Sequence, residues 1–470
     1  MGRHDGARGS LEQSRTRRTM VRVLIAIVVL ALIVAGGIAG TVVYQAKQRA
    51  DRLRAEVPVQ PAAVAYTPQL VGVDPAVSAP TADGTRAAIA AALRNPDLGR
   101  FTGIITDAVT GDVLWQQDPD LPRTPASTTK LLTAAAALLT LGDGSKVTTT
   151  VVAGDEPGTV VVVGAGDPTL TSLPPGKEGL SRGAARISTL ADQLRASGTS
   201  VQRILVDTSL FTGPQMAQGW DRADIAGGDI TPMQAFTTDS GRLDPTVDES
   251  PRSPEPALTA GRALAADLGL PASAVADGTA PAGAKVLASV QSAALGQRLL
   301  ESMTLSDNVV IEQIGMQVAG AVGKPRSIAG SAEAVLSVLQ DNGFDVSGVT
   351  LRDANGLSTE DRIPAAVLDR IVTAATSADH PKLRPLLDFL PIAGATGTLS
   401  DRYTTADRGG AGYVRAKTGS LSGVNTLAGF VNDRDGRVLT FALMSSGTSD
   451  GVARPAIDAI ATALRGCGCR

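Results

Sequence analysis

Three short motifs carry the residues of this chain whose types and spacing could do chemistry. They are, in order, Ser127-Thr-Thr-Lys130, Ser306-Asp-Asn308 and Lys417-Thr-Gly419. In the first motif a hydroxyl precedes an amine by three residues, a spacing that places both groups on one face of a helix. An alanine- and leucine-rich run with high helix propensity follows Ser127. We therefore expect Ser127 at a helix start, acting as a nucleophile with Lys130 as its base.

The second motif offers groups for proton transfer and for holding a substrate. An acyl-transfer site needs a nucleophile, a base, a proton path to the leaving group and donors for the oxyanion. We expect Ser306 to relay a proton between Lys130 and the leaving amine, and Asn308 to hold the substrate amide. These roles predict that the first two motifs meet in one cleft.

The third motif suits an extended peptide that ends in a carboxylate. Lys417 and Thr418 offer a cation and a hydroxyl, and Gly419 lets a substrate backbone approach and pair as an added strand. The expected oxyanion donors are the backbone N–H groups of Ser127 and Ser420. The substrate is therefore predicted to lie along this strand.

Lys130 must be neutral to accept a proton, although the pKa of a free lysine is about 10.4. Burial disfavours the ammonium form, and Lys417 would lower the pKa of Lys130 further if the fold brings the two amines together. Histidine does not supply the base. His4 precedes the first apolar segment, and His380 stands before Pro381 and is interpreted as a loop residue.

Each motif residue also has a purely structural interpretation. Ser127 could be a helix N-cap, Lys130 a solvated helix residue, Ser306 and Asn308 turn formers, and Lys417 a charge at a strand edge. Taken singly, these interpretations are the commoner ones. Taken together they require three coincidences, because none of the three motifs occurs a second time.

The N-terminal part of the chain predicts a membrane anchor and a stalk. Residues 23–44 are apolar and uncharged, long enough to cross a hydrocarbon core of about 30 Å, and arginines in residues 1–22 predict a cytoplasmic tail. A cleaved signal peptide is the alternative, although its apolar part usually has only about 7 to 15 residues. Residues 45–86 are rich in Pro and Ala and are interpreted as a stalk. We expect a single-pass protein of the cell membrane whose catalytic body lies on the extracytoplasmic side.

The remaining sequence predicts an α+β body with an insertion. Residues 87–145 and 290–470 are assigned to the catalytic domain, and residues 146–289 to an inserted domain. Strands are expected at 101–107, 111–115, 146–154, 158–164, 415–420, 426–431 and 437–445, and helices near 87, 127, 185–197, 299–305 and 455–464. The catalytic part is predicted to be an antiparallel sheet with helices from both ends of the folded body.

Composition excludes one large class of partners. The net charge is −3, aromatic residues make up 3% of the chain, and no basic stripe with interleaved aromatic residues occurs, so we expect no nucleic acid partner. Cys467 and Cys469 end the chain and are interpreted as part of a flexible tail. Because only these cysteines and two histidines are present, we expect no metal site and no cofactor.

At the level of these motifs the sequence resembles the D-alanyl-D-alanine carboxypeptidase and endopeptidase family, the low-molecular-mass class C penicillin-binding proteins. The shared segments are Ser127-Thr-Thr-Lys-Leu-Leu-Thr133, Gly166-Asp-Pro-Thr-Leu170, Ser306-Asp-Asn308 and Ala416-Lys-Thr-Gly-Ser-Leu421. The resemblance implies a transpeptidase-like fold, cleavage of peptidoglycan stem peptides and acylation of Ser127 by β-lactams. The segment Asp353-Ala-Asn-Gly-Leu-Ser358 is similar to the family's Asp-Gly-Ser-Gly-Leu-Ser but differs at two inner positions, so no role is assigned to it.

Two other functions remain open from sequence. A serine β-lactamase would share the three motifs, but the Glu-x-x-Leu-Asn loop of the commonest class is not found between the second and third motifs. A catalytically silent wall-binding module would use the same cleft as a peptide clamp, and the intact pair of Ser127 and Lys130 argues against it.

Overall fold

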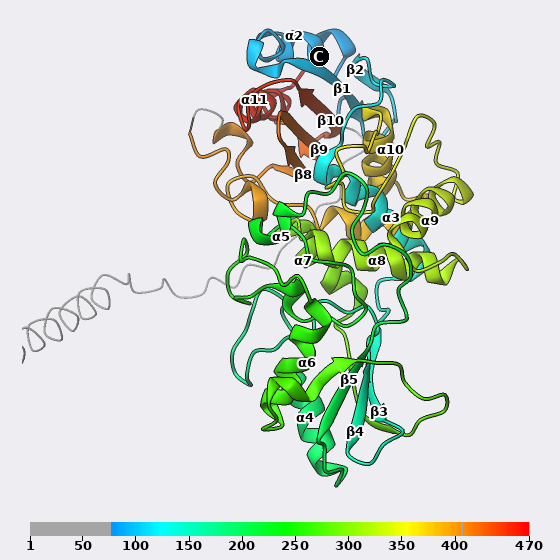
Figure 1. The fold of residues 1–470 in the computed structure, drawn as a ribbon. Helices are drawn as coiled ribbons and strands as arrows, with labels where there is room; N and C mark the ends of the chain where they lie inside the picture. The colour runs from blue at the N-terminus through cyan, green and yellow to red at the C-terminus, as the bar shows by residue number, and fades with distance from the viewer. Residues whose placement is uncertain (1–76, 406–407, 470) are drawn as a thin grey trace, which may run out of the picture. The chain divides into compact units, whose positions relative to one another are not determined.

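The fold is organised around two five-stranded sheets in a computed structural model that describes residues 77–405 and 408–469 (Figure 1). Sheet 1 has the strand order β2-β1-β10-β9-β8 and every pair in it is antiparallel. Its strands are β1 (Arg100–Asp107), β2 (Val113–Gln117), β8 (Val414–Leu421), β9 (Val424–Asn432) and β10 (Val438–Ser446). Because β1 pairs with β10, strands from the two ends of the folded body lie side by side in one sheet.

Helices cover both faces of sheet 1. On one face lie α2 (Ala82–Leu93) and α11 (Ala453–Gly466), which share a core with Phe441 and Leu427. The other face packs against α3 (Lys130–Thr140) and α10 (Ala365–Thr376) through Ala428 and Ala442. Every residue of β10 except the last is buried, as expected for a strand covered on both sides.

A helical layer connects this sheet to the second motif. It contains α3, α7 (Leu295–Leu305), α8 (Asn308–Ala321), α9 (Ile328–Asp341) and α10. In α3, nine of eleven residues are buried, beginning with Lys130 itself. Short 3-10 helices complete the connections: η1 (Pro96–Leu98), η2 (Ala126–Thr129), η3 (Asp239–Gly241), η4 (Ala272–Ala274), η5 (Pro381–Leu387), η6 (Gly397–Leu399) and η7 (Arg408–Gly410).

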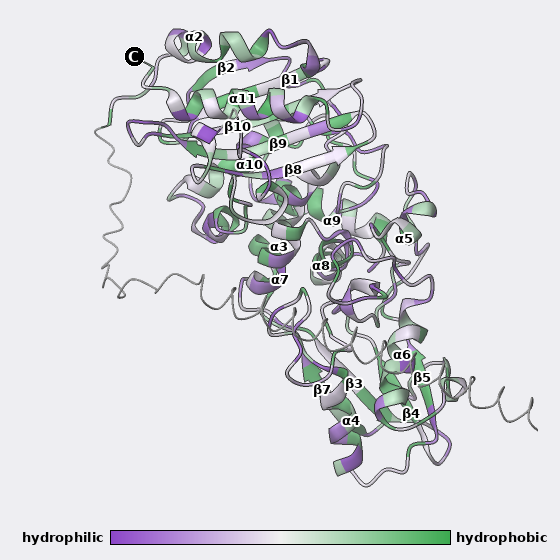
Figure 2. Cartoon of the chain, turned by 90° about the vertical axis from the view of Figure 1, so that its left-hand side faces the viewer, coloured by the Kyte–Doolittle hydropathy of each residue, from purple (hydrophilic) through white to green (hydrophobic). Residues whose placement is uncertain are grey.

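Sheet 2 comes from the stretch between the first and second motifs. Its order is β6-β5-β4-β3-β7, with strands β3 (Thr148–Ala153), β4 (Thr159–Val163), β5 (Arg203–Asp207), β6 (Val275–Asp277) and β7 (Val286–Gln291). The pairs β4–β5 and β5–β6 are parallel. The helices α4 (Ile187–Ala196) and α6 (Pro256–Asp267) share its hydrophobic core, and Figure 2 shows hydrophobic residues along its strands.

Part of the predicted insertion does not belong to sheet 2. The segment around α5 (Ala223–Gly227) packs on the helical layer, where Trp220, Ile230 and Met233 contact residues of α8 and α9. We call residues 208–255 the strap. The inserted-domain assignment stays a prediction, but this packing places the strap beside the second motif.

The α+β prediction is confirmed as a mixed fold of sheets and helices, and two predictions about the chain ends are wrong. The stalk was predicted to reach residue 86, yet α2 begins at Ala82, where the Thr81 hydroxyl accepts a hydrogen bond from the Gly84 N–H at 3.0 Å. The cysteine tail was predicted to be flexible. Cys467 is instead buried and disulfide-bonded to Cys469, whose carbonyl accepts a hydrogen bond from the Thr81 N–H at 2.6 Å.

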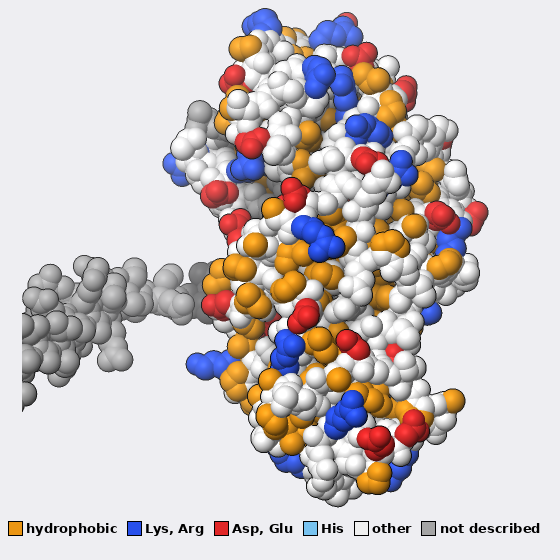
Figure 3. Space-filling model, viewed as in Figure 1, with side chains coloured by type: hydrophobic (Ala, Val, Ile, Leu, Met, Phe, Trp, Pro, Cys, Tyr) orange, Lys and Arg blue, Asp and Glu red, His pale blue; other side chains and the backbone are white. Residues whose placement is uncertain are grey.

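The predicted anchor at residues 23–44 lies outside the described residues. Within residues 77–405 and 408–469, no helix is both long and apolar enough to cross a membrane. On the face shown in Figure 3, acidic and basic side chains are interspersed, in line with the small net charge.

Candidate active site

Ser127 lies in a strained turn rather than in a regular α-helical start. The turn is η2, and α3 begins at Lys130, so the prediction of an α-helix from Ser127 is wrong by one 3-10 turn. Ala126 has φ 49°, in the left-handed region that non-glycine residues seldom adopt. Ser127 makes no capping hydrogen bond, so the N-cap interpretation of this residue is wrong as well.

Two glycines allow neighbouring segments to pack closely against this turn, because a side chain at either position would clash with it. A side chain on Gly419 of β8 would lie 2.7 Å from the Pro125 carbonyl oxygen, and one on Gly356 would lie 2.7 Å from Thr129 Oγ1. Gly356 also has φ 85°, which favours glycine. The sequence interpretation explained Gly419 by substrate pairing, whereas in the fold its missing side chain lets β8 pack against the nucleophile turn.

The amine of Lys130 has three neighbours, and only one of them can donate a proton to it. Nζ lies 2.8 Å from Ser127 Oγ, 2.6 Å from Asn308 Oδ1 and 2.8 Å from the Asn355 carbonyl oxygen. The Asn308 Nδ2 donates to the Asp229 carbonyl at 3.0 Å, which fixes the amide so that Oδ1 faces Lys130. A neutral amine therefore directs its two N–H bonds at Asn308 and Asn355 and its lone pair at the Ser127 hydroxyl.

The electrostatic surroundings favour this neutral form. Lys130 is fully buried, and burial lowers its pKa to about 7, against the opposing charges of nearby carboxylates, of which Asp353 and Asp307 are the largest. The interpretation of Lys130 as a solvated helix residue is therefore wrong.

Lys417 lies in the same site, as predicted, and it is also fully buried. Its Nζ donates to Ser306 Oγ and to the Thr418 carbonyl, each at 2.9 Å. Burial, followed by the charge of Lys130, lowers the pKa of Lys417 well below its ordinary value. The predicted repulsion between the amines is present, and it adds to burial in lowering the pKa of Lys417.

Ser306 joins two helices instead of simply ending one. It is the C-cap of α7 with φ 62°, and Asp307 caps α8 by accepting hydrogen bonds from the Val309 and Val310 N–H groups at 2.9 and 3.0 Å. Ser306 was predicted to relay a proton from Lys130, yet in the structure its Oγ accepts a hydrogen bond from Lys417. The second motif thus bridges both amines: Asn308 contacts Lys130 and Ser306 contacts Lys417.

The strap holds the second motif through buried charges that sequence reasoning missed. Arg242 Nη1 lies 2.9 Å from Asp307 Oδ2, with both side chains at most 5% exposed, and Arg252 lies 3.8 Å from the same oxygen. Burial would raise the pKa of Asp307, but the two arginines and the Val310 N–H lower it to about 2. No local pattern links Arg242 to Ser306-Asp-Asn308, because the two segments are far apart in the sequence.

The segment 353–358, to which no role was assigned, builds another wall of the site. Asp353 accepts hydrogen bonds from Asn355 N, Gly356 N, Ser358 N and Trp220 Nε1, at 2.6 to 3.1 Å. This loop supplies the Asn355 carbonyl that contacts Lys130. Asn355 contacts Lys130 through its backbone carbonyl, a contact that does not depend on the side chain at this position. The resemblance of residues 353–358 to the family's segment was therefore a usable sign of their role, although two inner side chains differ.

The remaining predicted residues lie around this centre. Thr418 Oγ1 donates to Thr398 Oγ1 at 2.7 Å, and Ser420 is exposed and accepts a hydrogen bond from Arg454 Nη2 at 3.2 Å. His380 lies elsewhere, just before η5, with its ring 5.3 Å from that of Phe344. Among the described residues no cluster of His, Cys, Asp and Glu could hold a metal ion.

The sheet is built from both ends of the body, and a half-buried Ser127 and a buried Lys130 meet a Ser–Asn turn and a Lys-Thr-Gly strand. This arrangement defines an active-site serine acyl-transfer enzyme. Residues 85–253 and 245–466 match the D-Ala-D-Ala carboxypeptidase 3 (S13) family, and the chain belongs to this family. Carboxypeptidase DacB of Mycolicibacterium smegmatis is 51% identical over 463 residues, covering 98% of this chain and 100% of the relative. This match extends the similarity far beyond the motifs.

More distant relatives match over most of the chain. The D-alanyl-D-alanine carboxypeptidase of an Actinomadura species is 29% identical over 84% of this chain and 87% of its own length. The crystal structure of penicillin-binding protein 4 from Haemophilus influenzae matches with a TM-score of 0.65 and 21% identity, over 82% of this chain and 98% of the other. The likeness to that structure confirms the predicted α+β fold of antiparallel sheet and helices.

We predict that the rate at which a fluorescent penicillin acylates Ser127 is proportional to the fraction of Lys130 in the neutral form. The rate rises with pH, is half-maximal near pH 7 and falls about tenfold per pH unit below that, because only the neutral amine accepts the serine proton. Lys130→Gln lowers the rate by at least about 100-fold, while Lys324→Gln, at a partly exposed site, leaves it unchanged. A rate that stays flat between about pH 5 and pH 9 contradicts this assignment.

A second prediction concerns the strap. Arg242→Met leaves Asp307 buried without its nearest cation and loosens the turn that carries Ser306 and Asn308, so kcat falls by up to about 100-fold with a smaller change in KM. Arg242→Lys recovers part of the loss. Arg262→Met, which breaks an exposed pair with Glu255, is the matched control and leaves both constants unchanged. Equal kinetics for Arg242→Met and Arg262→Met would show that the strap does not position the motif.

Proposed function

We propose that this chain is a serine D-Ala-D-Ala carboxypeptidase that cleaves peptidoglycan stem peptides through an acyl-enzyme on Ser127. The observation that carries the proposal is the buried Lys130 amine, 2.8 Å from Ser127 Oγ, whose other two partners only accept hydrogen bonds. Membership of the S13 family supports the substrate class, since relatives in it are named D-alanyl-D-alanine carboxypeptidases.

In acylation, Ser127 Oγ attacks the carbonyl carbon of the terminal peptide bond while its proton moves to Lys130 Nζ. The negative charge on the substrate oxygen is stabilised by the backbone N–H groups of Ser127 and Ser420. The Lys130 ammonium then gives the proton to the departing amine by way of the Ser306 hydroxyl, which accepts a hydrogen bond from Lys417 in the structure and turns toward Lys130 in this step of the proposal. The C–N bond breaks, D-alanine leaves, and Lys130 is neutral again.

Deacylation uses the same base. Water loses a proton to Lys130 as it attacks the ester carbon, and the ammonium returns the proton to Ser127 Oγ as the ester bond breaks. The cycle restores every group without a metal or cofactor step.

The third motif binds the substrate in this proposal. Ser420 offers its hydroxyl to the terminal carboxylate, and Thr418 does so when its hydroxyl turns from Thr398 to the substrate. Arg454, whose guanidinium donates to Ser420 Oγ, adds a positive charge beside them. Asn308 holds the substrate amide through the second N–H of its Nδ2, since the other N–H donates to the Asp229 carbonyl. A bound β-lactam forms the same ester with Ser127.

The direct test is product analysis with the full chain. Incubation with a stem pentapeptide is expected to release one D-alanine and leave a tetrapeptide, as resolved by mass spectrometry, and Ser127→Ala abolishes the release. A cross-linked muropeptide in parallel measures endopeptidase cleavage. No product from either substrate, with penicillin still bound at Ser127, contradicts the proposal and favours a wall-binding module; rapid hydrolysis of penicillin favours a β-lactamase.

We further propose that residues 23–44 anchor the chain in the cell membrane, with the folded body on the extracytoplasmic side. The support is the apolar, uncharged run after several arginines. The full chain is expected to stay with membranes after alkaline carbonate washing, and protease added outside spheroplasts degrades the body. Release of the body by carbonate, or protection from the protease, contradicts the anchored topology.

A further inference from the structure

Glu312 lies one helical turn after Asn308 on α8 and is fully buried beside the active site. Residues four apart share a helix face, so the carboxyl group of Glu312 and the amide of Asn308 point to the same side. The proposed reaction uses Asn308 but gives no task to Glu312. Burying an acid is unfavourable unless hydrogen bonds compensate, so the partners of Glu312 decide what it contributes.

The carboxyl group of Glu312 joins α8 to the loop that follows α9. Its Oε2 accepts hydrogen bonds from the Ala354 N–H at 2.8 Å and from Asn355 Nδ2 at 2.7 Å. Asn355 is also fully buried, and its own Oδ1 accepts a hydrogen bond from the Leu357 N–H at 2.7 Å. Both ends of the Asn355 side chain are therefore fixed, and its backbone carbonyl is held where it accepts a hydrogen bond from Lys130.

Glu312 thus sets the positions of both acceptors that orient Lys130. Asn308 Oδ1 belongs to the same helix as Glu312, and the Asn355 carbonyl belongs to the loop that Glu312 holds. With two N–H bonds directed at fixed acceptors, the lone pair of the Lys130 amine has one direction left, toward Ser127. Release of the loop would let the amine rotate, and misplacing a catalytic group by about 1 Å can cost about 100-fold in rate.

The third partner of Glu312 indicates that this side chain carries a proton. Ser331 on α9 is fully buried, and its Oγ lies 2.9 Å from Glu312 Oε1 and 2.7 Å from the Ile328 carbonyl oxygen. A hydroxyl has one proton, and a carbonyl oxygen only accepts. Both contacts are hydrogen bonds at once when Ser331 donates to Ile328 and Glu312 donates from Oε1 to Ser331. The neutral acid therefore satisfies both of its oxygens.

The electrostatic surroundings agree with a neutral acid. Burial, followed by the charge of Asp353, raises the pKa of Glu312 to about 8. Asp361, whose pKa is raised to about 10 by burial and by Asp353, and Lys130 also interact with Glu312 electrostatically. An ionised Glu312 would raise the pKa of Lys130, whereas the neutral form leaves the amine ready to accept the serine proton. The other charged groups that act on Lys130 or are acted on by it, from α8, the strap and β8, are Asp307, Asp229 and Lys417.

We propose that Glu312 is a positioning residue of the acyl-transfer reaction: as a neutral carboxylic acid it ties the Asn355 loop to α8 and so keeps the Lys130 lone pair directed at the nucleophile. Its effect on the amine passes through the two acceptors that it fixes. This role rests on the proposed acyl transfer by Ser127 and deepens it, because it assigns the group that holds the base in its working orientation.

The test measures, in the full chain, the rate constant with which a saturating fluorescent penicillin acylates Ser127, the dissociation constant before acylation, and the pH at which the rate is half-maximal. Glu312→Gln keeps the bonds of the neutral acid, since its oxygen accepts two hydrogen bonds and its amide donates to Ser331. We expect its rate constant to stay within about threefold of wild type, with the midpoint still near pH 7. Glu312→Met has a similar length and none of these bonds, so we expect a rate constant at least about tenfold lower with a smaller change in the dissociation constant.

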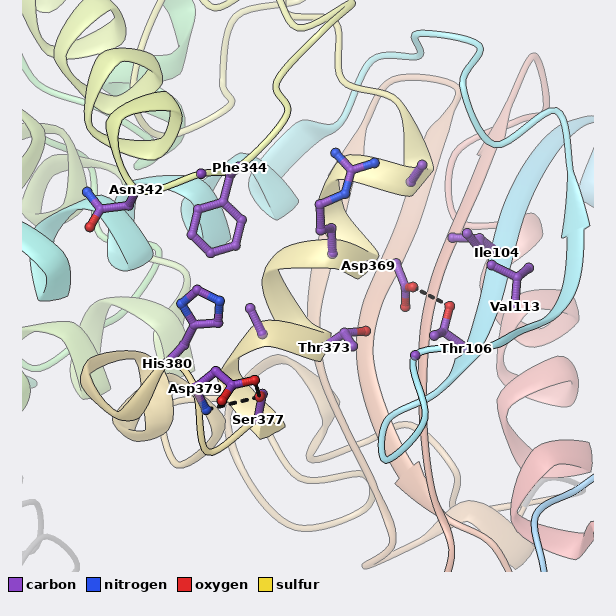
Figure 4. Close-up of a pocket in the computed structure, with 15 residues that line it drawn as sticks. Ile104, Thr106, Val113, Asn342, Phe344, Asp369, Thr373, Ser377, Asp379 and His380 are labelled. Carbon is purple, nitrogen blue, oxygen red and sulfur yellow. Dashed lines mark hydrogen bonds between the residues drawn. The ribbon is translucent and has the colours of Figure 1, made fainter.

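Asp369 provides the matched control, because it is another buried acid with a raised pKa. It lies on α10 beside the groove shown in Figure 4, where its Oδ2 accepts a hydrogen bond from Thr106 Oγ1 at 2.6 Å, and burial raises its pKa to about 6. Thr106 belongs to β1, which β10 and β9 separate from β8, the strand that carries Lys417. Asp369→Asn is therefore expected to leave the rate constant and the midpoint unchanged.

Four results overturn the proposal. A midpoint that falls by about half a pH unit or more in Glu312→Gln shows that Glu312 is ionised, because removing a negative charge lowers the pKa of Lys130. A rate constant of Glu312→Gln as low as that of Glu312→Met, or a Gln variant that does not fold while Asp369→Asn does, shows that the neutral bonding pattern is not what the site needs. A wild-type rate constant in Glu312→Met shows that the loop does not depend on this acid.

Asn355→Ala decides the case where Glu312→Met fails to fold, as judged from its melting temperature. This variant removes the other end of the bridge and keeps the backbone carbonyl that contacts Lys130, so the rate constant is expected to fall at least about tenfold. A wild-type rate constant in Asn355→Ala overturns the positioning role. A wild-type chain that penicillin does not label at Ser127 would overturn the proposed function itself, and with it this role of Glu312.

Discussion

The orientation of one amine is the constraint on which the rest of the active site depends. Lys130 is a useful base only if its lone pair faces Ser127, and a lone pair on a freely rotating amine has no fixed direction. The Asn308 Oδ1 and the Asn355 carbonyl remove this freedom because neither can donate a hydrogen bond. The Asp229 carbonyl contributes to the same orientation. It accepts a hydrogen bond from Asn308 Nδ2 and so keeps Asn308 Oδ1 directed at Lys130.

This constraint explains why the fold joins such distant parts of the chain. The partners of Lys130 come from α8 and from the loop after α9, and the acceptor behind Asn308 comes from the strap. Sheet 1 brings β8 against η2, the turn that carries Ser127. The absence of a side chain at Gly419 and Gly356 allows their backbones to approach this turn closely. The segment between the first two motifs thus takes part in the site, because the strap within it brings Arg242 to the carboxylate of Asp307, which caps α8.

The sequence was sufficient to predict those contacts of the site that depend on side-chain type and on short spacing along the chain. A serine three residues before a lysine predicts their contact from helix geometry alone, and the strands of sheet 1 were predicted from short runs separated by polar turns. The carbonyls of Asn355 and Asp229 could not be found in this way, because every residue has a carbonyl and only the tertiary fold selects one. The pairing of Arg242 with Asp307 was missed for a related reason: its energy comes from burial, which no short pattern encodes.

The acids beneath Lys130 show how a buried base keeps its lone pair. Carboxylates close to an amine raise its pKa, so three ionised acids would turn Lys130 into an ammonium that accepts no proton. Burial and the charge of Asp353 instead raise the pKa of Glu312 to about 8 and that of Asp361 to about 10. Most of the negative charge near the loop is therefore absent at neutral pH, while the same groups still hold the loop by hydrogen bonds. Burial, reinforced by repulsion from Asp353, thus lets one cluster of acids build the wall of the site without protonating its base.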